Sequence, residues 1–470
     1  MVLRTYKGHF TDVSLKNNTP VNTEVLWGGG LGDDLVRIST SRSSRFMRQR
    51  FAIMVIVTTV HMSMASAILN GANLNVPGDY STIHEAVDAA NDGDHVVVAP
   101  GVYVSGVAEI WQKSIQIRSS GGAAATTIDC QLAGGGIRVY QGDGVTSIDG
   151  FTLIGSGEAS GMGPFPGISV YDSSAVIKNC NFYDNWCAIQ LDGGGANSDG
   201  SSLCTISNCQ FDQNHGGQLA GGIQGWSGMQ VSVDNCAFVG NTSSWGGGAV
   251  YFSKSVDAEF ADCVFSFNEV HGESSGSYPP YGGAFAMALE CVAEFTRCTF
   301  ESNKCDFGIG GAVRGWKSNA DFVECNFFNN TSEAGFAIVL DEGSAGGILQ
   351  CLFSDFSPID GNLIVIDPTS SVSMSNTAIC GAQDEHISGE WIDGGGNCIT
   401  FSCGDSNENG FPDSCECLAD TDGSGQVGAE DVAALVAWWG SDAALCDFDF
   451  DGSVGVRDLL FLLENWGSCV

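Results

Sequence analysis

A six-residue motif, Cys-x-Phe-x-x-Asn, recurs in phase along the middle of the chain and constrains its fold more than any other feature. Successive motif cysteines are 29, 27, 27, 35, 27 and 26 residues apart. A period of this size indicates a solenoid, in which each coil stacks on the preceding one. Six complete copies begin at Cys180, Cys209, Cys236, Cys263, Cys298 and Cys325, and a seventh keeps Cys351 and Phe353 but has Phe356 in place of the Asn.

A second motif, a Gly-Gly pair followed by Ile or Ala, recurs between the cysteines. It ends at Ile223, Ala249, Ala284 and Ala312. Each period therefore holds at least two short strands with turns between them. Stacking such units at about 4.8 Å, the spacing of hydrogen-bonded strands, predicts an all-β parallel β-helix.

The repeated residues have different expected roles in such a coil. Cys and Phe alternate with polar residues, so both side chains are expected to point inward. The Asn is expected in a turn, where its amide bonds backbone groups and the equivalent Asn of neighbouring coils. Stacked cysteines would hold their Cβ atoms about 4.8 Å apart, beyond the usual 3.5–4.5 Å of a disulfide, so we expect buried free thiols.

The region before the repeats fits a capped solenoid. Thr82-x-x-Glu85 is a capping box, and Ile83, Val87 and Ala90 form one apolar helical face. We expect a short helix that covers the open end of the first coil, which needs a cap.

Charge excludes several classes of partner. The chain carries 55 acidic and 18 basic residues, a formal charge of −37. Eight bases and four acids precede residue 68, so the remainder has 51 acids against 10 bases, a net of −41. Such a surface repels nucleic acid and anionic lipid. It also repels acidic polysaccharide unless a divalent cation bridges the two.

The beginning of the sequence reads as a targeting segment. Arg48 and Arg50 precede an apolar run from Phe51 to Val60, and the small-x-small pattern Ala65-Ser66-Ala67 follows. We therefore expect a signal peptide over residues 47–67, with residues 1–46 a doubtful upstream extension. The expected location of the mature protein is extracellular or at the cell surface, without a membrane span.

Two stretches resemble known β-helix proteins. The segment "VPGDYSTIHEAVDAANDGDHVVVAPGVY", Val76 to Tyr103, resembles the opening of pectin-lyase-like proteins. The Gly-Gly-Ala and Phe-x-x-Asn repeats are similar to those of chlamydial polymorphic outer-membrane proteins. The resemblance covers roughly residues 75 to 380 and implies a right-handed, single-stranded parallel β-helix. We expect this domain to span residues 68–397.

Aligning the Gly-Gly-Ala strands predicts two outward-facing columns on one face of the β-helix, the face where pectin-lyase-like enzymes bind sugar chains. Exposed aromatic rings there could stack on sugars. The first column is Arg138, Ser169, Gln190, Gln224, Tyr251, Ala286, Arg314 and Ile338, and the second is Tyr140, Tyr171, Asp192, Trp226, Ser253, Ala288, Trp316 and Leu340. The candidate ligand-binding residues are Tyr140, Tyr171, Asp192, Trp226, Tyr251, Arg314 and Trp316.

Catalytic residues are not identified by these columns. A hydrolase of this fold needs paired carboxylates, and Asp192 is the single carboxylate in the alignment. A polysaccharide lyase needs a base, often Arg, near calcium-holding carboxylates, and Arg138 and Arg314 lie about six coils, or roughly 30 Å, apart. Three alternatives remain: a carbohydrate-binding or structural protein, which we favour, a polysaccharide lyase or glycoside hydrolase, and a protein-binding adhesin.

The tail after Cys398 has a different pattern, rich in calcium-loop sequences. A first loop offers Asp405, Asn407, Asn409 and Glu416 and resembles a thrombospondin-type calcium loop. Two further loops repeat at an offset of 27 residues, and their candidate Ca²⁺ ligands are Asp420, Asp422, Ser424, Gln426 and Asp431 in one and Asp447, Asp449, Asp451, Ser453 and Asp458 in the other. A helix with an apolar face is expected after each loop. The face of the first helix consists of Val432, Leu435, Val436 and Trp439, and that of the second consists of Leu459, Leu462, Leu463 and Trp466.

The paired loops and helices resemble a dockerin type I module, which we expect over residues 418–470, after a cysteine-rich linker at 398–417. In that family the helices and loop positions 10 and 11 bind a cohesin domain. Here these positions are Ala429-Glu430 and Val456-Arg457 rather than Ser-Thr pairs, so the resemblance implies calcium more strongly than cohesin. Six cysteines predict a disulfide framework of unassigned pairing: Cys398, Cys403, Cys415, Cys417, Cys446 and Cys469.

Overall fold

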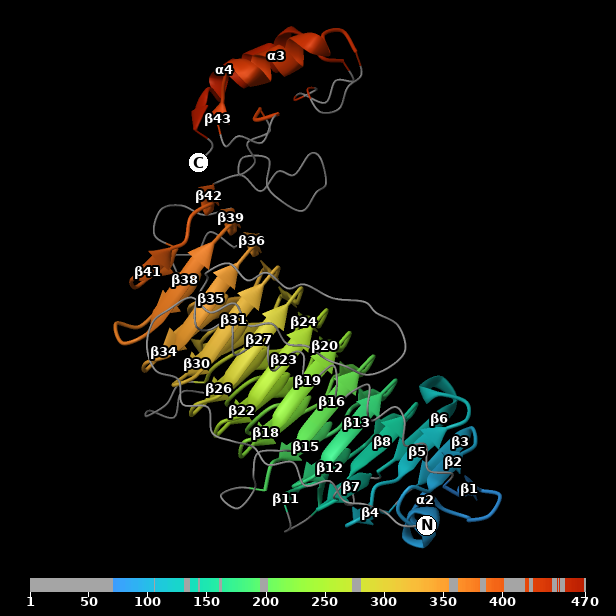
Figure 1. Cartoon of the computed structure of the whole chain (residues 1–470). Coiled ribbons are helices and arrows are strands. Elements are labelled where there is room, and N and C mark those ends of the chain that lie inside the picture. The colour runs from blue at the N-terminus through green and yellow to red at the C-terminus, as the bar shows by residue number, and fades with distance from the viewer. Residues whose placement is uncertain are drawn as a thin grey trace, which may run out of the picture. The chain divides into compact units, whose positions relative to one another are not determined.

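The computed structural model describes residues 71–104, 106–130, 136–142, 144–159, 163–194, 202–272, 280–354, 362–380, 386–400, 419–421, 426–441, 446, 448 and 453–468. The expected signal peptide at 47–67 and the upstream residues 1–46 lie outside these ranges. The described residues between 71 and 400 form a parallel β-helix in which three sheets run side by side along the coil axis (Figure 1).

Sheet A has thirteen strands across the described residues, each paired in parallel with the next coil. Its strands are β1 (Asn73–Val76), β2 (His95–Val98), β5 (Gln116–Ser119), β8 (Val145–Asp149), β13 (Ser174–Lys178), β16 (Leu203–Ser207), β19 (Gln230–Asp234), β23 (Asp257–Ala261), β27 (Val292–Thr296), β31 (Asn319–Val323), β35 (Ala345–Leu349), β38 (Ser371–Ser375) and β41 (Trp391–Asp393).

Sheet B follows sheet A in each coil and carries the Phe of the repeat. Its strands are β3 (Gly101–Val104), β6 (Thr126–Asp129), β9 (Thr152–Ile154), β14 (Asn181–Tyr183), β17 (Gln210–Asp212), β20 (Ala237–Val239), β24 (Val264–Ser266), β28 (Thr299–Glu301), β32 (Asn326–Phe328), β36 (Leu352–Ser354), β39 (Ala378–Cys380) and β42 (Cys398–Thr400).

Sheet C carries the strands that follow the Gly-Gly motif. Its strands are β4 (Ala108–Trp111), β7 (Ile137–Tyr140), β12 (Ile168–Tyr171), β15 (Ile189–Asp192), β18 (Ile223–Trp226), β22 (Val250–Ser253), β26 (Phe285–Ala288), β30 (Val313–Trp316), β34 (Ile338–Asp341), β37 (Ile364–Ile366) and β40 (Ile387–Ser388).

A smaller parallel sheet, the side sheet, lies between sheets B and C in the coil path. It consists of β21 (Thr242–Ser243), β25 (Glu269–Val270), β29 (Lys304–Ile309) and β33 (Thr331–Ala334). The remaining short elements of the β-helix are the antiparallel pair β10 (Glu158–Ala159) and β11 (Gly163–Pro164) and the 3₁₀ turn η1 (Ala123–Ala125).

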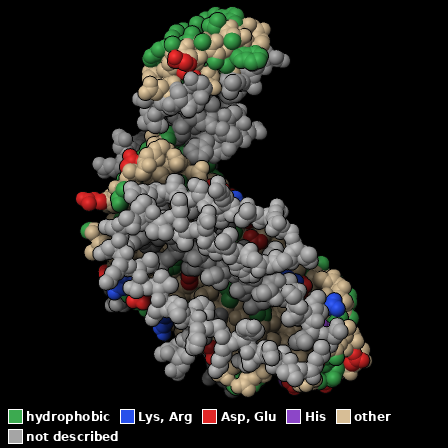
Figure 2. All heavy atoms as spheres, viewed as in Figure 1, with side chains coloured by type: hydrophobic (Ala, Val, Ile, Leu, Met, Phe, Trp, Pro, Cys, Tyr) green, Lys and Arg blue, Asp and Glu red, His purple; other side chains and the backbone are tan. Residues whose placement is uncertain are grey.

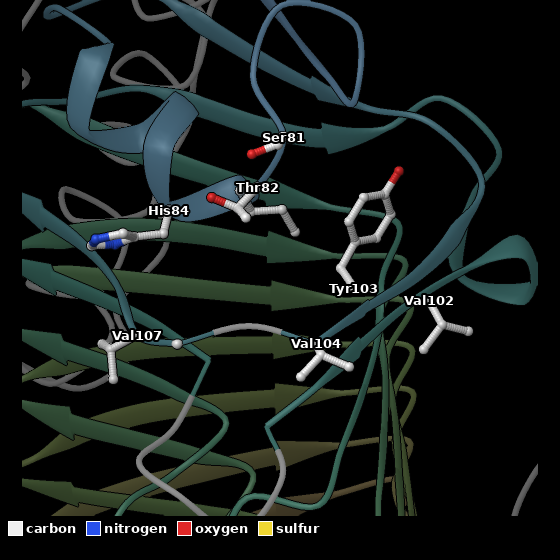
Figure 3. Close-up of a pocket in the computed structure, with 9 residues that line it drawn as sticks. Ser81, Thr82, His84, Val102, Tyr103, Val104 and Val107 are labelled. Atoms are coloured by element: carbon white, nitrogen blue, oxygen red, sulfur yellow. The ribbon is translucent and has the colours of Figure 1, made fainter.

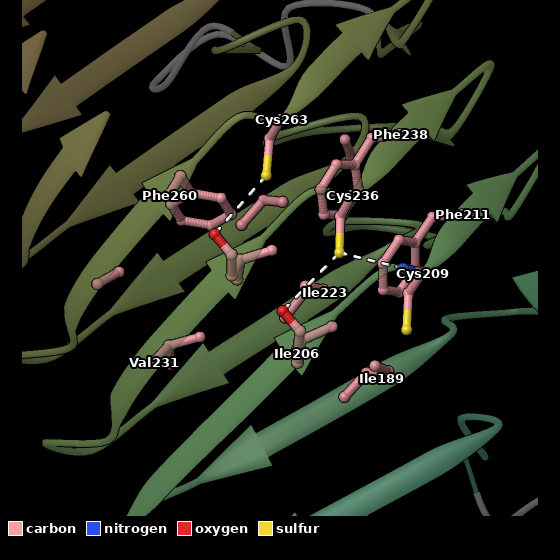
Figure 4. Close-up of a cluster of buried hydrophobic side chains, with 14 of the residues drawn as sticks. Ile189, Ile206, Cys209, Phe211, Ile223, Val231, Cys236, Phe238, Phe260 and Cys263 are labelled. Atoms are coloured by element: carbon pink, nitrogen blue, oxygen red, sulfur yellow. Dashed lines mark hydrogen bonds between the residues drawn. The ribbon is translucent and has the colours of Figure 1, made fainter. Parts of the chain in front are cut away.

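The interior is a set of side-chain columns, because each residue pairs with its equivalent one coil away. The Phe of the repeat forms a stack whose ring centroids lie 4.5 to 4.9 Å apart (Figure 4). Phe260, Phe295 and Phe322 form a second column from sheet A. These rings are fully buried. Offset aromatic stacking stabilises such columns beyond the burial of apolar area.

The Asn of the repeat forms a continuous hydrogen-bonded ladder, as the sequence predicts. Each side-chain Nδ2 donates to Oδ1 of the next Asn at 2.9 to 3.0 Å. Nδ2 of Asn268 also donates to the carbonyl of Phe238, and its Oδ1 accepts from the backbone N–H of Asn241. The six ladder residues are buried. At this corner of the coil their side chains form the hydrogen bonds that water would otherwise form with the backbone groups.

The motif cysteines occupy the corner between sheets A and B as free, buried thiols, which confirms that prediction. Cys263 Sγ donates to the carbonyl of Ala261 at 3.2 Å. Its neighbours Cys209 and Cys236 lie in the same column (Figure 4). The thiols fill small positions where a larger side chain would separate the coils.

The corners require left-handed backbone. The residue before each motif Cys has positive φ, from 49° at Asn235 to 55° at Glu324. The Gly-Gly pairs have two distinct roles. In the pairs that end at Ala249, Ala284 and Ala312, the first glycine adopts positive φ, as at Gly282 with +68°. The second approaches the next coil so closely that a Cβ on Gly283 would lie 2.1 Å from a carbonyl oxygen.

The first coil is covered by α2 (Ile83–Ala89), which confirms the predicted cap. Thr82 Oγ1 accepts from the N–H of Glu85 at 3.1 Å, as in a capping box. The Glu85 carboxylate accepts from Ser81, one residue before the N-cap. Ile83 and Val87 are buried against the core.

The C-terminal segment has a core of its own. It contains α3 (Ala429–Ala437), α4 (Val456–Glu464) and the antiparallel pair β43 (Gln426–Val427) and β44 (Gly467–Ser468). Leu435 and Leu462, at the same offset of 27 residues, are both buried in this core. Cys446 is a buried free thiol here, so its inclusion in the predicted disulfide framework was wrong. Cys398 is disulfide-bonded as predicted, and Cys380 is also disulfide-bonded.

We expect replacement of a central ladder residue to destabilise the β-helix strongly. Asn268→Ala removes the acceptor of Asn241 and the donor to Phe238, leaving buried groups unpaired at a cost of about 2–4 kcal/mol. Chemical denaturation of the intact chain would measure this cost. Asn326→Thr is the matched control, since Asn326 points outward beside Thr299, and an equal loss in both variants would contradict the ladder's role.

Alkaline pH is expected to destabilise the fold through its thiols. Burial raises the pKa of Cys204 from 9.0 to about 12. The folded thiol keeps a proton that the unfolded thiol releases, so its contribution is complete below pH 9 and is lost as pH rises toward 12. The fall in denaturation midpoint from a pH below 9.0 to a pH above it should therefore be smaller in Cys204→Ala than in the parent chain. Identical pH slopes would exclude this thiol as a contributor.

Candidate functional site

The register of sheet C confirms the two predicted columns over seven coils and corrects them in the eighth. Strand β34 pairs with β30 so that Val339 lies beside Arg314 and Asp341 lies beside Trp316. The predicted members Ile338 and Leu340 instead point inward and are buried. A one-residue slip exchanges the two faces of a strand, and it concealed Asp341 as an outward carboxylate.

The first coils carry an aromatic tier formed by Trp111, Tyr140 and Tyr171. Tyr140 stacks on Tyr171 with ring centroids 5.1 Å apart and 7° between planes. Trp111, on β4, lies 5.6 Å from Tyr140 and is 56% exposed. Partial burial raises the pKa of the Tyr171 hydroxyl, which therefore remains a neutral hydrogen-bonding group. The tier offers a ring surface on the outside of the coil.

Arg138 lies next to this tier but is engaged within the protein. Its guanidinium contacts Glu109 at 3.4 Å and lies 4.6 Å from the centroid of the Phe165 ring. It therefore supports the neighbouring coils of sheet C.

A cleft of about 170 Å³ lies in the middle of the β-helix, over strands β22, β26 and β30. It is lined by Trp245, Tyr251, Tyr281, Ala288, Leu289, Arg314 and Trp316. Tyr251, Arg314 and Trp316 were predicted from the columns. Trp245 and Tyr281 were not, because they precede the Gly-Gly pairs and project over sheet C from the adjoining turns.

The two turn aromatics change the character of the predicted face. Tyr251 and Tyr281 are each 7% exposed, so Tyr251 is a wall of the cleft and not the exposed platform that the alignment suggested. Trp245 lies 5.3 Å from Tyr281, ring to ring. Burial, with a smaller effect of Tyr251, raises the pKa of the Tyr281 hydroxyl well above its usual range. The cleft thus has aromatic walls, and the Tyr281 hydroxyl in them keeps its proton.

Arg314 is held at the cleft by a nearly buried ion pair. Its Nη2 donates to Asp341 Oδ2 at 2.7 Å and its Nε donates to Oδ1 at 3.3 Å. The side chains are only 9% and 17% exposed. The guanidinium also lies 4.5 Å from the centroid of the Tyr281 ring. This bidentate geometry fixes the arginine and neutralises its charge.

The remaining predicted residues of this face lie between the two aromatic groups. Asp192 Oδ1 accepts from the N–H of Gly194, a bond within its own turn. Trp226 is half-buried on β18, beside Asp192 in the register. The structure therefore brings together Tyr140 with Tyr171, and Tyr251 with Arg314 and Trp316. The residues that line the cleft include hydrogen-bond donors and rings, which suit binding.

A second hollow lies beside the N-terminal cap and was not predicted. It has a volume of about 440 Å³ and is lined by residues 81–84, 102–104 and 106–107 (Figure 3). Val102 and Val104 are 70% and 56% exposed. The two valines make this hollow largely apolar on the side of β3.

The side sheet carries a charged cluster of Glu269, His271, Lys304 and Asp306. The Lys304 ammonium contacts Glu269 at 3.2 Å and Asp306 at 2.6 Å. Glu269, His271 and Asp306 are close enough to one another to share a cation. The lysine occupies that role, because its ammonium lies between the two carboxylates and lowers the pKa of Asp306.

The predicted calcium ligands are described in part. Asp431 and Asp458, the last ligands of the two repeated loops, are each 1% exposed. Asp431 accepts from the N–H groups of Thr421 and Gly428, and Asp458 accepts equivalently from Phe448 and Gly455. The predicted ligands outside the described residues are Asp405, Asn407, Asn409, Glu416, Asp422, Ser424, Asp447, Asp449 and Asp451. Asp420, Gln426 and Ser453 are described, and Gln426 pairs with Ser468 between β43 and β44.

Comparisons with known proteins agree on the architecture. Residues 101–327 match the family model described as a right handed beta helix region. No curated protein matches the sequence. Within the described residues, the helices are too short to cross a membrane.

Solved structures of similar fold include carbohydrate-active enzymes. A catalytic domain of GH87 alpha-1,3-glucanase bound to nigerose is 13% identical, with 72% of this chain and 67% of that chain covered and a TM-score of 0.38. A PL6 alginate lyase bound to a trisaccharide is 12% identical over 70% and 84%, with a TM-score of 0.36. The catalytic unit of the GH87 enzyme from Streptomyces thermodiastaticus is 12% identical over 70% and 67%, with a TM-score of 0.30. At these identities and TM-scores, the comparisons describe the fold and not the geometry of the cleft.

The buried ion pair gives a direct stability test. Asp341→Asn should destabilise the intact chain by about 3–5 kcal/mol, because it leaves the Arg314 charge shielded from water without a partner. Asp262→Asn is the matched control: Arg297 and Asp262 have the same two-bond geometry but are 51% and 45% exposed. Equal thermal shifts in the two variants would contradict the special role of the cleft pair.

Proposed function

We propose that the protein is a secreted or cell-surface glycan-binding β-helix with a calcium-stabilised C-terminal attachment segment. The observation that carries glycan binding is the aromatic cleft of sheet C. Four aromatic rings and the Arg314 guanidinium line a cleft of about 170 Å³. Asp341 holds the guanidinium in place. Sugars present apolar faces and hydroxyl edges, so rings and fixed polar groups are complementary to them.

The cleft is small for a complete ligand, which favours recognition of part of a longer chain. Pockets for drug-sized ligands measure roughly 300–1,000 Å³, above the volume of this cleft. The aromatic tier of Trp111, Tyr140 and Tyr171 lies five coils from Trp316 along the same outward column. At one coil per strand spacing this is roughly 24 Å. A polymer could contact both groups, while a short oligosaccharide would reach one.

A binding role is favoured over catalysis by the state of the cleft carboxylate. Hydrolysis by this type of fold uses two carboxylates flanking the scissile bond. Asp341 is engaged by Arg314 through two bonds. The enzyme alternative would gain support from release of reducing ends or unsaturated uronate by the intact chain, and such turnover would replace the present proposal.

Calcium binding by the tail is supported by the repeated, buried carboxylates Asp431 and Asp458. A carboxylate that is 1% exposed requires compensation. The backbone donors noted above provide part of it, and a calcium ion held with the loop oxygens would provide the rest. The bound ion would supply the positive charge that lets several aspartates approach one another.

The attachment role is supported by apolar side chains that are exposed on α3 and α4 and in the turns that follow them. Val436, Trp439, Leu463 and Trp466, related in pairs by the offset of 27 residues, are 46 to 56% exposed. Trp438 and Leu460 extend this surface. Hydrophobic side chains gather over these helices in Figure 2. An exposed apolar patch of this kind is typical of a protein-docking surface, which a cohesin-like or other surface protein could cover.

Trp316→Ala should weaken glycan binding roughly ten-fold or more, because loss of a stacking ring removes about 1.5 kcal/mol or more of binding free energy. Calorimetry of the intact chain with the polysaccharide that it retains best would measure the affinity. Trp439→Ala, just after the end of α3, is the matched tryptophan control and should leave glycan affinity unchanged. A similar loss in both variants would argue against the cleft.

Asp431→Asn and Asp458→Asn should each reduce calcium-dependent stabilisation of the intact chain. Calcium that binds only the folded segment raises its melting temperature with concentration, and each variant removes a buried ligand. Glu430→Gln, an exposed neighbour, is the control. Melting curves in calcium and in chelator should differ for the parent and Glu430→Gln. Curves that coincide for the parent chain would rule out calcium stabilisation.

A further inference from the structure

Resting on the proposed glycan binding, we infer that the cleft takes an uncharged sugar residue of a neutral polysaccharide. Uronate-rich and sulfated chains are excluded on one side, and amino-sugar chains on the other, because the charges in and around the cleft are already balanced within the protein.

The single cation inside the cleft is compensated. Two of the five N–H donors of the Arg314 guanidinium are directed at Asp341, through Nε and Nη2. A sugar carboxylate would have to compete with a carboxylate that is fixed, shielded and bidentate. The donors not used by Asp341 suit a sugar hydroxyl, which accepts one hydrogen bond without bringing a charge.

The cations at the rim are also offset by neighbouring carboxylates. Lys254 and Lys317 follow β22 and β30, and Glu290 and Glu342 occupy the corresponding turns after β26 and β34. Ser255 donates to Glu290 at 3.5 Å, which places that carboxylate beside the Lys254 turn. The surroundings of the cleft are thus nearly neutral, whereas residues 68–470 as a whole carry −41. A polyanion would meet repulsion from the acidic surface on approach, and Glu290 and Glu342 would offset the attraction of the two rim lysines.

A cationic ligand is disfavoured because cations of the protein already lie against two of the rings. Ammonium groups bind over aromatic rings, but Arg314 already lies 4.5 Å from the Tyr281 centroid and Lys317 lies 4.6 Å from the Trp316 centroid. A protonated amino sugar would face two like charges. The cleft therefore presents tyrosine hydroxyls, a guanidinium edge and ring surfaces, the groups that recognise hydroxyls and the apolar faces of sugars.

The test compares retention of the intact chain, with calcium present, by immobilised polymers of three charge classes: a glucan or xylan, an alginate or polygalacturonate, and chitosan. We expect the chain to bind the neutral polymer, with an affinity at least ten-fold lower in Trp316→Ala. Salt should leave this affinity unchanged, because an uncharged ligand has no electrostatic attraction for salt to screen. Tighter, Trp316-dependent binding to the acidic polymer or to chitosan would overturn the inference and leave glycan binding intact. Failure of every polymer would overturn the proposed function instead.

Two variants separate local charge from folding. Asp341→Asn leaves Arg314 uncompensated and should raise affinity for the acidic polymer severalfold relative to the neutral one. Because this substitution is also expected to destabilise the chain, Lys254→Met provides an independent measurement at an exposed rim position. It should leave neutral-polymer affinity unchanged within two-fold and acidic-polymer retention as low as in the parent. A marked loss of neutral-polymer binding in Lys254→Met would contradict the inference.

Discussion

The β-helix depends on one constraint, the in-register pairing of each coil with the next. Parallel pairing places like residues directly above one another. A side chain must therefore form favourable hydrogen bonds or packing contacts with the same kind of side chain on the next coil, and so on along the domain. The Asn ladder meets this requirement, because an amide is both donor and acceptor and can bond an identical amide indefinitely. The Phe columns meet it through offset stacking. Residues that cannot repeat favourably, such as charges, lie mostly outside.

The same constraint positions the cleft. Sheet C is regular, so its outward side chains form straight columns with one residue per coil. Irregularity enters through the turns, which are not bound by the strand register. Trp245 and Tyr281 project from such turns and convert part of a flat sheet into a walled site. The regular sheet determines the positions of Arg314 and Trp316, and the turns above it determine how far a bound ligand would be enclosed.

The periodic part of this structure could be predicted from the sequence, and the aperiodic part could not. The Cys, Phe and Asn columns followed from spacing alone, and so did seven coils of the sheet C alignment. The eighth slipped because Phe336 replaces the second glycine of the pair, which removed the anchor of the alignment and hid Asp341. Trp111 was missed because its coil has neither motif. Tyr281 was missed because its distance from the strand is set by a turn and not by the period.

Among the described residues, the disulfide-bonded cysteines lie at one end of the β-helix. The seven column cysteines in the middle coils are free thiols, whereas Cys380 and Cys398, on the final two strands of sheet B, are disulfide-bonded. A middle coil is held by neighbours on both sides, but a terminal coil has one neighbour and frays first. Helix α2 protects the opposite end by covering it. Unravelling of this domain would thus have to start at a protected end, one guarded by packing and the other by covalent bonds, so its resistance to proteases is set by its ends rather than by its length.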